Sequence, residues 1–323
     1  MKKTALFLAL TAPALAQAEK VEIDMPDFYG KANVSVQNAT EGGNSFSEVK
    51  SNASRIGFKG KGELGHGLTA IYQVEYQYNA DGDNDETFEG ETETGLEVEV
   101  EGSETFSQRN TYAGLDSDYG QVIIGRFDTP LKKLQKKVDL FNDLEGDIKT
   151  VITSSDNREE NSVQYTSPKF AGLQLKVDQI ASEDRSSDRK DAVSTSLTYT
   201  RGDYYFGVAY DDKVEGNDTD VLRAVTQVNI AGAQLGALWE QQDEDGEKTE
   251  GWLLSASYKL GAVKLKAQHG ESEIRDEDGA RTTSVGADYK LGKGAKAFVY
   301  YTANNYKDSD NTDYAGVGIE YKF

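Results

Sequence analysis

The chain has no cysteine, only four prolines and two histidines, and no long apolar run beyond its first twenty residues. Without cysteine, a disulfide framework, thiolate metal sites and cysteine nucleophiles are excluded. A bilayer-spanning helix needs about 20 apolar residues, so none is expected after the N-terminus. Basic residues are also scarce, because 35 Lys and Arg against 56 Asp and Glu give a net charge of −21. Such a chain lacks the basic stripe of a nucleic-acid-binding protein, and no nucleic-acid partner is expected.

The N-terminal residues have the three parts of an export signal. Met1 to Lys3 is basic, Thr4 to Ala16 is mostly apolar, and Ala16-Gln17-Ala18 places small residues at a cleavage site. The apolar run is too short for a membrane anchor and contains a proline. We therefore predict a signal peptide over residues 1–18 and one mature domain over residues 19–323.

The last twelve residues alternate between two faces of an extended strand. The apolar face carries Ala315, Val317, Ile319, Tyr321 and Phe323, and the other face is largely polar. Each face must therefore meet a different solvent. A C-terminal strand of this form that ends on Phe resembles the signature of Gram-negative outer-membrane barrels.

Tight glycine-bearing turns and longer polar connections alternate along the chain. The seven turns lie at 65–67, 118–120, 170–172, 201–203, 231–233, 260–262 and 291–294. The eight longer connections lie at 38–51, 79–104, 128–160, 182–190, 213–218, 243–247, 272–279 and 305–311. Together they predict 16 strands, and this pattern of short turns and long loops is typical of bacterial transmembrane barrels. The predicted fold is all-β, a 16-stranded antiparallel transmembrane β-barrel.

Periodicity alone does not separate this barrel from a soluble sandwich or solenoid, whose strands also alternate. The export signal, the terminal Phe and the strand count favour the membrane barrel. Two strands, at 203–210 and 296–301, carry aromatic residues on both faces. We interpret them as a subunit contact or as an interfacial aromatic girdle.

Four segments resemble the general trimeric porins of Gram-negative bacteria. They are Arg55-Ile56-Gly57-Phe58-Lys59-Gly60, Arg109 to Leu115, Gly125 to Leu131, and Asn161 to Tyr165 with Ser167-Pro168. With the C-terminal strand, the resemblance covers essentially the whole mature chain. It implies an outer-membrane porin, a water-filled channel for passive diffusion of ions and small hydrophilic solutes. It also implies a homotrimer that contacts outer-membrane lipid and lipopolysaccharide.

The same resemblance implies that the third loop, Asp128 to Glu160, folds into the lumen and narrows it. Its acids Asp139, Asp143, Glu145 and Asp147 would then face a basic wall of Arg55, Arg109 and Arg126. Opposed charges in a narrow channel create a transverse field that favours polar solutes. The alternative is that these groups are solvated or paired with each other.

Leu131, Leu134 and Val138 have helical spacing and predict a short amphipathic helix in that loop. The lysines beside them would place positive charge at the constriction, so ion selectivity stays open. Net charge and the acidic loops lean towards cations.

The segment Asn79 to Glu104 contains eleven acids and no Lys or Arg. Asp81, Asp83 and Asp85 hint at a calcium loop, but the glycine and the bidentate glutamate of an EF-hand are missing. No specific metal site is predicted. The alternatives are loose condensation of divalent ions and, by the resemblance, a latch onto a neighbouring subunit.

Enzyme functions find little support in the sequence. His66 lies in a tight turn and His269 on the apolar face of its strand, so neither suggests a catalytic triad. No phosphate-binding or dinucleotide motif is present, and no cofactor is predicted. The competing functions are a non-conducting structural or adhesive barrel and, more remotely, a barrel hydrolase that depends on His269.

Overall fold

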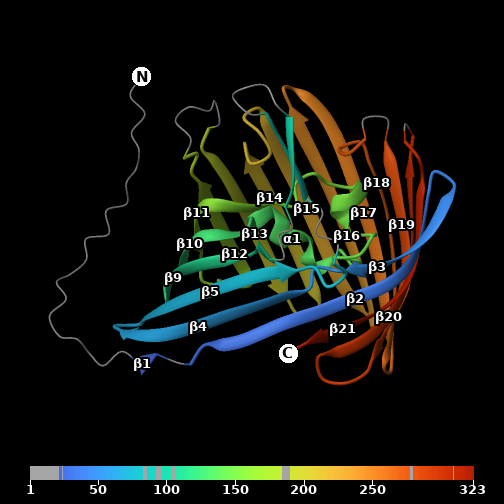
Figure 1. Cartoon of the computed structure of the whole chain (residues 1–323). Helices are drawn as coiled ribbons and strands as arrows, with labels where there is room; N and C mark the ends of the chain where they lie inside the picture. Colours follow the sequence, from blue (N-terminus) through green and yellow to red (C-terminus); the bar gives the residue numbers. More distant parts are fainter. Residues whose placement is uncertain are drawn as a thin grey trace.

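The computed structural model describes residues 22–23, 25–82, 86–91, 97–102, 106–183, 190–276, 279–307 and 309–323. In this part of the chain, one antiparallel sheet closes on itself into a 16-stranded barrel, as the sequence predicts. The ring is closed by β2 (Asp27–Glu41) and β21 (Thr312–Lys322), which pair from Lys31↔Lys322 to Glu41↔Thr312. Figure 1 shows these two strands from opposite ends of the chain side by side. The predicted signal peptide lies outside the described residues.

Two positions in the wall are each built from two shorter strands. The second holds β3 (Asn44–Ser51) and β4 (Arg55–Gly65), and the fourth holds β8 (Phe106–Gln108) and β9 (Thr111–Ser117). The other strands are β5 (Leu68–Tyr78), β10 (Gly120–Asp128), β11 (Arg158–Thr166), β12 (Leu173–Ile180), β13 (Ala192–Arg201), β14 (Tyr204–Asp212), β15 (Thr219–Ile230), β16 (Ala233–Glu244), β17 (Glu247–Leu260), β18 (Val263–Ser272), β19 (Ala280–Lys290) and β20 (Ala295–Tyr306).

A few elements lie outside this ring of strands. β1 (Glu22–Ile23) pairs with β4, and β6 (Glu86–Glu91) forms a separate hairpin with β7 (Glu97–Gly102). The helical segments are α1 (Pro130–Leu134), η1 (Gln135–Lys137) and α2 (Ile148–Val151). Among the described residues, none of the helices has the length and apolar character to cross a membrane.

All seven predicted tight turns connect consecutive barrel strands. At the first of them, His66 and Gly67 both have positive φ (54° and 75°), the conformation of a mirror-image hairpin turn. Two predicted loops are wrong in extent. Residues 38–51 are mostly the paired ends of β2 and β3, and only residues 245–246 separate β16 from β17. Strand pairing continues beyond the membrane, where both faces meet water and polarity no longer marks the end of a strand.

The barrel is apolar outside and polar inside. On β2, Val36 is 55% exposed, whereas its lumen-facing neighbours Ser35 and Gln37 are buried among other inward side chains. The predicted outer row of β21 follows the same rule, since Val317, Ile319 and other large members are exposed. Because lipid offers no hydrogen bonds, only a closed ring leaves no unpaired strand edge in the bilayer.

The terminal residue takes part in closing the ring. The backbone N–H of Gly30 donates to the Phe323 oxygen at 3.0 Å, and the Phe323 N–H donates to the Gly30 oxygen at 3.1 Å. A Cβ at Gly30 would overlap the Phe323 ring, so only glycine allows this approach. The Phe323 ring also lies 5.7 Å from that of Phe28 on β2.

Buried apolar side chains gather inside the barrel, where the segment between β10 and β11 contacts the wall. The larger cluster joins Leu131, Leu134, Val138, Ile148, Val151 and Ile152 to Tyr205, Ala209, Val221, Val225, Leu238, Leu253 and Ala280. A smaller cluster places Phe141 against Phe298 and Tyr300. The inward aromatics of β14 and β20 therefore receive this segment. From the sequence we expected a subunit contact or an aromatic girdle, and neither explains these inward side chains.

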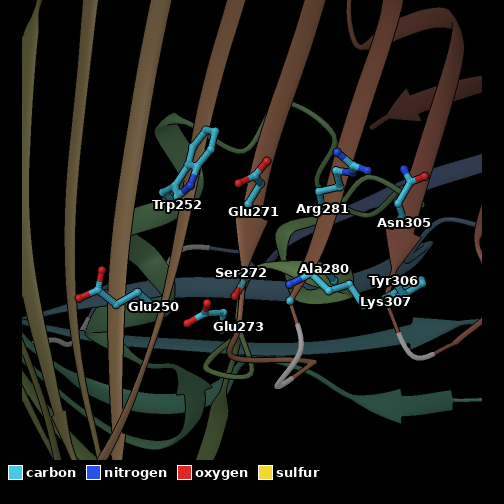
Figure 2. A pocket seen from close by; sticks show the side chains of 11 residues that line it. Glu250, Trp252, Glu271, Ser272, Glu273, Ala280, Arg281, Asn305, Tyr306 and Lys307 are labelled. Carbon is cyan, nitrogen blue, oxygen red and sulfur yellow. The ribbon is translucent and has the colours of Figure 1, made fainter.

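The outer face carries a hollow near the ends of β17 to β20 that lie away from the tight turns. Its volume is about 410 Å³, and charged and aromatic side chains line it. Figure 2 shows Trp252, Glu271, Arg281 and Asn305 in a row across adjacent strands.

Candidate functional site

The third connection of the barrel lies inside the lumen. It covers residues 129–157, between the end of β10 and the start of β11, within the predicted 128–160. Figure 1 shows its helices surrounded by the strands. We call this segment the inserted loop.

The first helix of the inserted loop starts at two local signals. The Thr129 hydroxyl accepts a hydrogen bond from the backbone N–H three residues later (3.1 Å), and Pro130 occupies the first turn. Both features are favoured at a helix N-terminus because N–H groups there lack partners within the helix. Leu131 and Leu134 are buried against the wall. The helix predicted over residues 131–138 is therefore present as α1 and η1.

A buried ion pair, which we call the clamp, holds both arms of the inserted loop against the wall. Its members are Arg223 on β15 and Glu240 on β16, which are cross-strand partners and fully buried. Arg223 also donates to two oxygens in the first arm, on Leu131 and Gln135. Its remaining nitrogen donates to two oxygens in the second arm, within residues 153–155. The guanidinium thus joins two strands and two loop arms.

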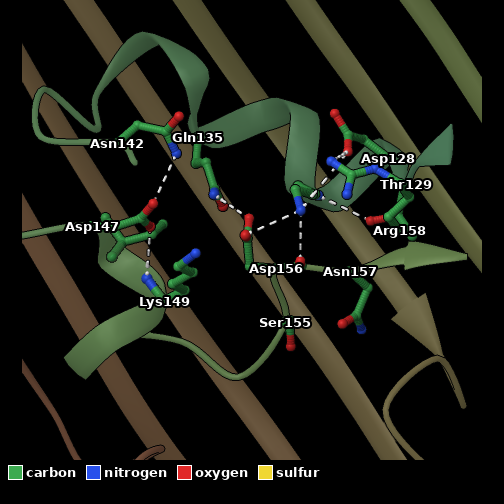
Figure 3. Close-up of polar contacts among 12 residues, drawn as sticks. Asp128, Thr129, Gln135, Asn142, Asp147, Lys149, Ser155, Asp156, Asn157 and Arg158 are labelled. Atoms are coloured by element: carbon green, nitrogen blue, oxygen red, sulfur yellow. Dashed lines mark hydrogen bonds and ion pairs between the residues drawn. The ribbon is translucent and has the colours of Figure 1, made fainter. Parts of the chain in front are cut away.

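A second set of ion pairs lies where the inserted loop leaves and rejoins the wall (Figure 3). Asp128, at the end of β10, pairs with Arg158 at 2.8 Å, Lys136 at 3.1 Å and Lys132 at 3.8 Å. Lys132 also contacts the Asp156 carboxylate at 3.1 Å. These contacts fix the two ends of the loop relative to each other.

Two of the four predicted loop acids are turned into the loop itself. Asp147 caps α2 by accepting from the Lys149 N–H at 3.1 Å, and it also accepts from the Asp143 N–H at 2.8 Å. Asp139 accepts from the side chain of Gln268 on β18 at 3.4 Å. Burial raises the pKa of both carboxyls, that of Asp147 to about 6, and the charge of Asp147 raises that of Asp139 further. Neither carboxylate contacts the predicted basic wall, because each accepts hydrogen bonds that shape the loop.

The other two acids meet basic side chains across the lumen. The Asp143 carboxylate lies 2.5 Å from Lys31 Nζ and 3.8 Å from Arg55. Glu145 lies 3.6 Å from Lys50 Nζ. Burial alone would raise the pKa of Asp143, but the charges of Lys31 and Arg55 and the hydrogen bond from Lys31 outweigh it, so this pKa lies below its ordinary value.

The structure brings two of the three predicted arginines together. Arg109 donates to Glu75 at 2.9 Å and to Gln77 at 2.7 Å, and Arg55 lies 3.9 Å from the same Glu75 carboxylate. These inward side chains come from β4, β5 and the segment between β8 and β9. We call Arg55 and Arg109, together with Lys31, the basic wall.

Arg126 does not join the basic wall. It pairs at 3.4 Å with Glu160, whose side chain is largely exposed. Along β10 it falls on the outward side with Val122 and Ile124, and the register of β10 against β11 shifts between Gly125 and Phe127. Alternation along β10 already gives this outward side, so the assignment of Arg126 to the wall rested on the porin resemblance alone.

Lys31, Lys50 and Glu75 also contact the predicted site residues, although the sequence did not single them out. Lys31 belongs to the polar row of β2, and Glu75 to the polar row of β5, so strand parity was the signal available for both. Their pairing with Asp143 and Arg109 depends on how the inserted loop sits and is not visible in the sequence.

A cavity of about 910 Å³ opens above the inserted loop, on the side of the long connections. Its ionisable lining consists of eight basic and five acidic residues: Lys50, Arg55, Arg109, Lys132, Lys136, Lys149, Arg158 and Arg275, with Asp128, Asp143, Glu145, Asp147 and Asp156. A second cavity of about 410 Å³ lies on the side of the tight turns. Five lysines (Lys136, Lys137, Lys264, Lys266, Lys296) line it, with Asp139, Asp288 and Glu320. Lys136 lines both cavities.

Several other predictions concern places away from the lumen. Asp83 and Asp85 of the acidic segment lie outside the described residues, whereas Asp81 accepts from the Ser51 N–H at 2.6 Å. Within the described ranges, no group of three or more His, Asp or Glu side chains is arranged to hold a metal ion. His269 lies on the outer face, where its Nδ1 is 2.7 Å from Thr283 Oγ1.

Comparison with known proteins decides the family. A model of Gram-negative porins matches residues 4–322. The chain belongs to the Gram-negative porin family. It is 25% identical to the major outer membrane protein P.IB of Neisseria meningitidis over the full length of both chains. It is 26% identical to the protein of that name from Neisseria gonorrhoeae, over 100% of this chain and 90% of the relative.

Solved structures show the same fold. An anion-selective porin from Comamonas acidovorans matches with a TM-score of 0.71 and 17% identity, covering 94% of this chain and 100% of that one. OmpF of Salmonella typhi, solved with daunomycin, matches with a TM-score of 0.70 and 19% identity, covering 92% and 97%. This porin is therefore a channel of the Gram-negative outer membrane, through which solutes diffuse passively.

Proposed function

We propose that ions and small hydrophilic solutes pass the inserted loop through the cavity that Asp143 and Glu145 line together with Lys50, Arg55 and Arg109, beside the point where Asp143 meets Lys31. The observation that carries this proposal is the direct contact of loop acids with wall cations across the lumen, at 2.5 Å for Asp143 and Lys31. Opposed charges at a narrow point orient polar solutes and disfavour apolar ones. Mature residues 19–323, without the signal peptide 1–18, make up the channel.

The experiment is single-channel recording in a planar bilayer. An open channel gives stable conductance steps, and neutral sugars of graded size give its radius. Asp143→Asn should alter conductance, because it removes one pole of the opposed charges. The alternative, a plugged structural or adhesive barrel, predicts no conductance steps from correctly folded protein.

The channel prefers anions in this proposal, although the chain as a whole carries a net charge of −21. Support comes from the cavity linings, in which basic residues outnumber acidic ones on both sides of the inserted loop. The charge near the path of an ion governs selectivity more than distant charge does, because salt screens charges beyond about 8 Å at physiological ionic strength. The anion selectivity of the Comamonas neighbour points in the same direction. The cation preference expected from the sequence rested on the net charge, and that net charge also counts charges in the outer loops.

Reversal potential across a KCl gradient tests this preference, and a cation-selective sign would overturn it. Lys136→Gln should shift the reversal potential towards cations, because Lys136 lines both cavities and its side chain is 59% exposed. Lys248→Gln is the matched control, since Lys248 lies at the outer end of β17 and pairs with Asp243 at 3.7 Å.

A homotrimer in contact with outer-membrane lipid and lipopolysaccharide completes the proposal. One solved neighbour is described as a trimer form, with 15% identity and a TM-score of 0.65. Closure of single insertions in three equal steps, together with the mass of the detergent-solubilised protein, tests the assembly. A single closing step and a monomeric mass would refute it.

A further inference from the structure

Three successive rows of outward side chains cover β17, β18 and β19. Cross-strand register aligns them as Trp252, Glu271 and Arg281, then Leu254, His269 and Thr283, then Ala256, Ala267 and Val285. Figure 2 shows the first row, which continues to Asn305 on β20. Chain neighbours such as Leu253 and Ser284 are buried, so all three rows face away from the lumen.

The rows change from charged to apolar with depth in the membrane. The first row lines the hollow of about 410 Å³, and the other two line an adjacent groove of about 400 Å³. In the groove, Leu254 and Val285 are exposed and apolar, as the lipid-facing belt requires. Charged side chains on a barrel's outer face are tolerated near the membrane interface, which Trp also prefers. The hollow therefore lies at the headgroup level of the outer leaflet, and the groove lies beside the acyl chains.

The second row places a polar pair within this apolar belt. His269 Nδ1 lies 2.7 Å from Thr283 Oγ1, and the His269 ring meets that of Trp252 edge-on at 5.6 Å. The other imidazole nitrogen, Nε2, has no hydrogen-bond partner among the residues that the structure describes. Acyl chains offer none either, and an unpaired polar group is costly in hydrocarbon. A ligand hydroxyl at this depth would satisfy it, because a hydroxyl both donates and accepts and so matches either tautomer.

The hollow supplies the groups that a phosphorylated sugar needs. Arg281 and Lys307 are exposed there, and neither forms an ion pair within the described part of the chain. A guanidinium is well suited to a phosphate. Glu271 and Asn305 add a carboxylate and an amide, which hydrogen-bond to sugar hydroxyl and amide groups.

We infer that the hollow and the groove together bind a phosphorylated, acylated amino sugar, and that His269 and Thr283 recognise a hydroxyl on its acyl chain. Phosphorylated glucosamine with 3-hydroxyacyl chains is the lipid part of lipopolysaccharide, the glycolipid of the outer leaflet. Arg281 holds the phosphate, and the chain lies in the groove over Ala256 and Ala267. Successive rows are about 7 Å apart along a strand, which the linkage and first carbons of an acyl chain span.

This inference deepens the proposed contact with lipopolysaccharide and does not depend on conduction through the lumen. Native mass spectrometry of the detergent-solubilised protein tests it. The probes are two synthetic glucosamine 1-phosphates, one with two 3-hydroxytetradecanoyl chains and one with two tetradecanoyl chains. We expect the hydroxylated lipid to bind about tenfold more tightly, as one or two hydrogen bonds allow. Equal binding would overturn the inference while leaving the lipopolysaccharide contact intact, and binding of neither lipid would overturn both.

Variants separate the two halves of the site. Thr283→Val and His269→Phe should each reduce the preference for the hydroxylated lipid, and the double variant should abolish it without weakening binding of the other lipid. Arg281→Gln should instead weaken both lipids about tenfold and leave the ratio between them unchanged.

All of these side chains lie on the outer face, so the barrel should fold normally, which its heat-modifiable migration on gels will show. Lys248→Gln, which removes a cation outside the hollow, should leave both affinities unchanged. A double variant that still prefers the hydroxylated lipid would refute the assignment of His269 and Thr283.

Discussion

Removing Arg223 should release the inserted loop from the wall without unfolding the barrel. Arg223→Met takes away the cation of the clamp and leaves the Glu240 carboxylate fully buried, where the hydroxyl of Thr153 still donates to it at 2.5 Å. It also removes the donors to both arms of the loop. The strand ladder of β15 and β16 is unaffected, because it consists of backbone hydrogen bonds.

The expected magnitude follows from burial. Breaking a fully buried ion pair by removing one partner costs about 3–5 kcal/mol. Each 1.4 kcal/mol is a factor of ten in an equilibrium constant. The attached state of the loop should therefore lose a factor of about one hundred to several thousand relative to detached states. A loop that is rarely detached in the native channel should then be detached for a measurable fraction of the time.

Single-channel recording is the assay. Arg223→Met should show increased open-channel noise and a spread of conductance levels, whereas the native channel gives one level. Removing both charges, in Arg223→Met with Glu240→Leu, should restore much of the quiet behaviour, since replacing a buried pair by apolar groups is often neutral. Arg201→Met, at the exposed end of β13, is the control. If Arg223→Met is as quiet as the native channel, or if the double variant is as noisy as the single one, the clamp does not hold the loop.

Three further outcomes are expected. The pKa of Asp147 is raised to about 6 from an ordinary 3.8, so its protonated form stabilises the folded loop. This stability is complete below pH 3.8 and is lost as pH rises through 6. Open-channel noise should therefore increase from pH 5 to pH 8 in the native channel but not in Asp147→Asn. Gly30→Val should overlap the Phe323 ring and lower the temperature at which the barrel loses its heat-modifiable form, while Gly292→Val, at a position with open space and no positive φ, should change it less. Phe141→Ala, which empties a fully buried site against Phe298 and Tyr300, should destabilise the loop tip by about 3–5 kcal/mol and raise conductance; unchanged conductance would show that the tip does not narrow the pore.

Strand parity made most of the barrel predictable. A strand between lipid and water must alternate, so the lumen-facing position of Arg55 follows from counting by twos. Arg109 does not follow this rule, because it has the parity of the outward Leu115 and lies at the break between β8 and β9. The inward Tyr205, Phe298 and Tyr300 break this alternation, because they pack against the inserted loop. The sequence shows that the alternation is broken at these positions, but it does not show that the inserted loop is the reason.

The inserted loop was less predictable because it has no strand period. All four of its acids look alike in the sequence, yet Asp139 and Asp147 accept hydrogen bonds that shape the loop while Asp143 and Glu145 meet the wall. Local backbone geometry, such as the positive φ of 66° at Asp143, decides which carboxylates point into the loop and which reach the wall. Arg126 was assigned to the wall by the porin resemblance, although alternation along β10 places it on the outward side with Val122 and Ile124.

Pairing between β2 and β21 has a consequence for assembly. The first and last barrel strands must find each other across nearly the entire length of the polypeptide, so the cylinder cannot be completed until the final segment has arrived. Until then two long edges with unsatisfied amides face hydrocarbon or water. A chain from which β21 is deleted should therefore accumulate as an open sheet that aggregates with other chains, even if its remaining hairpins are intact.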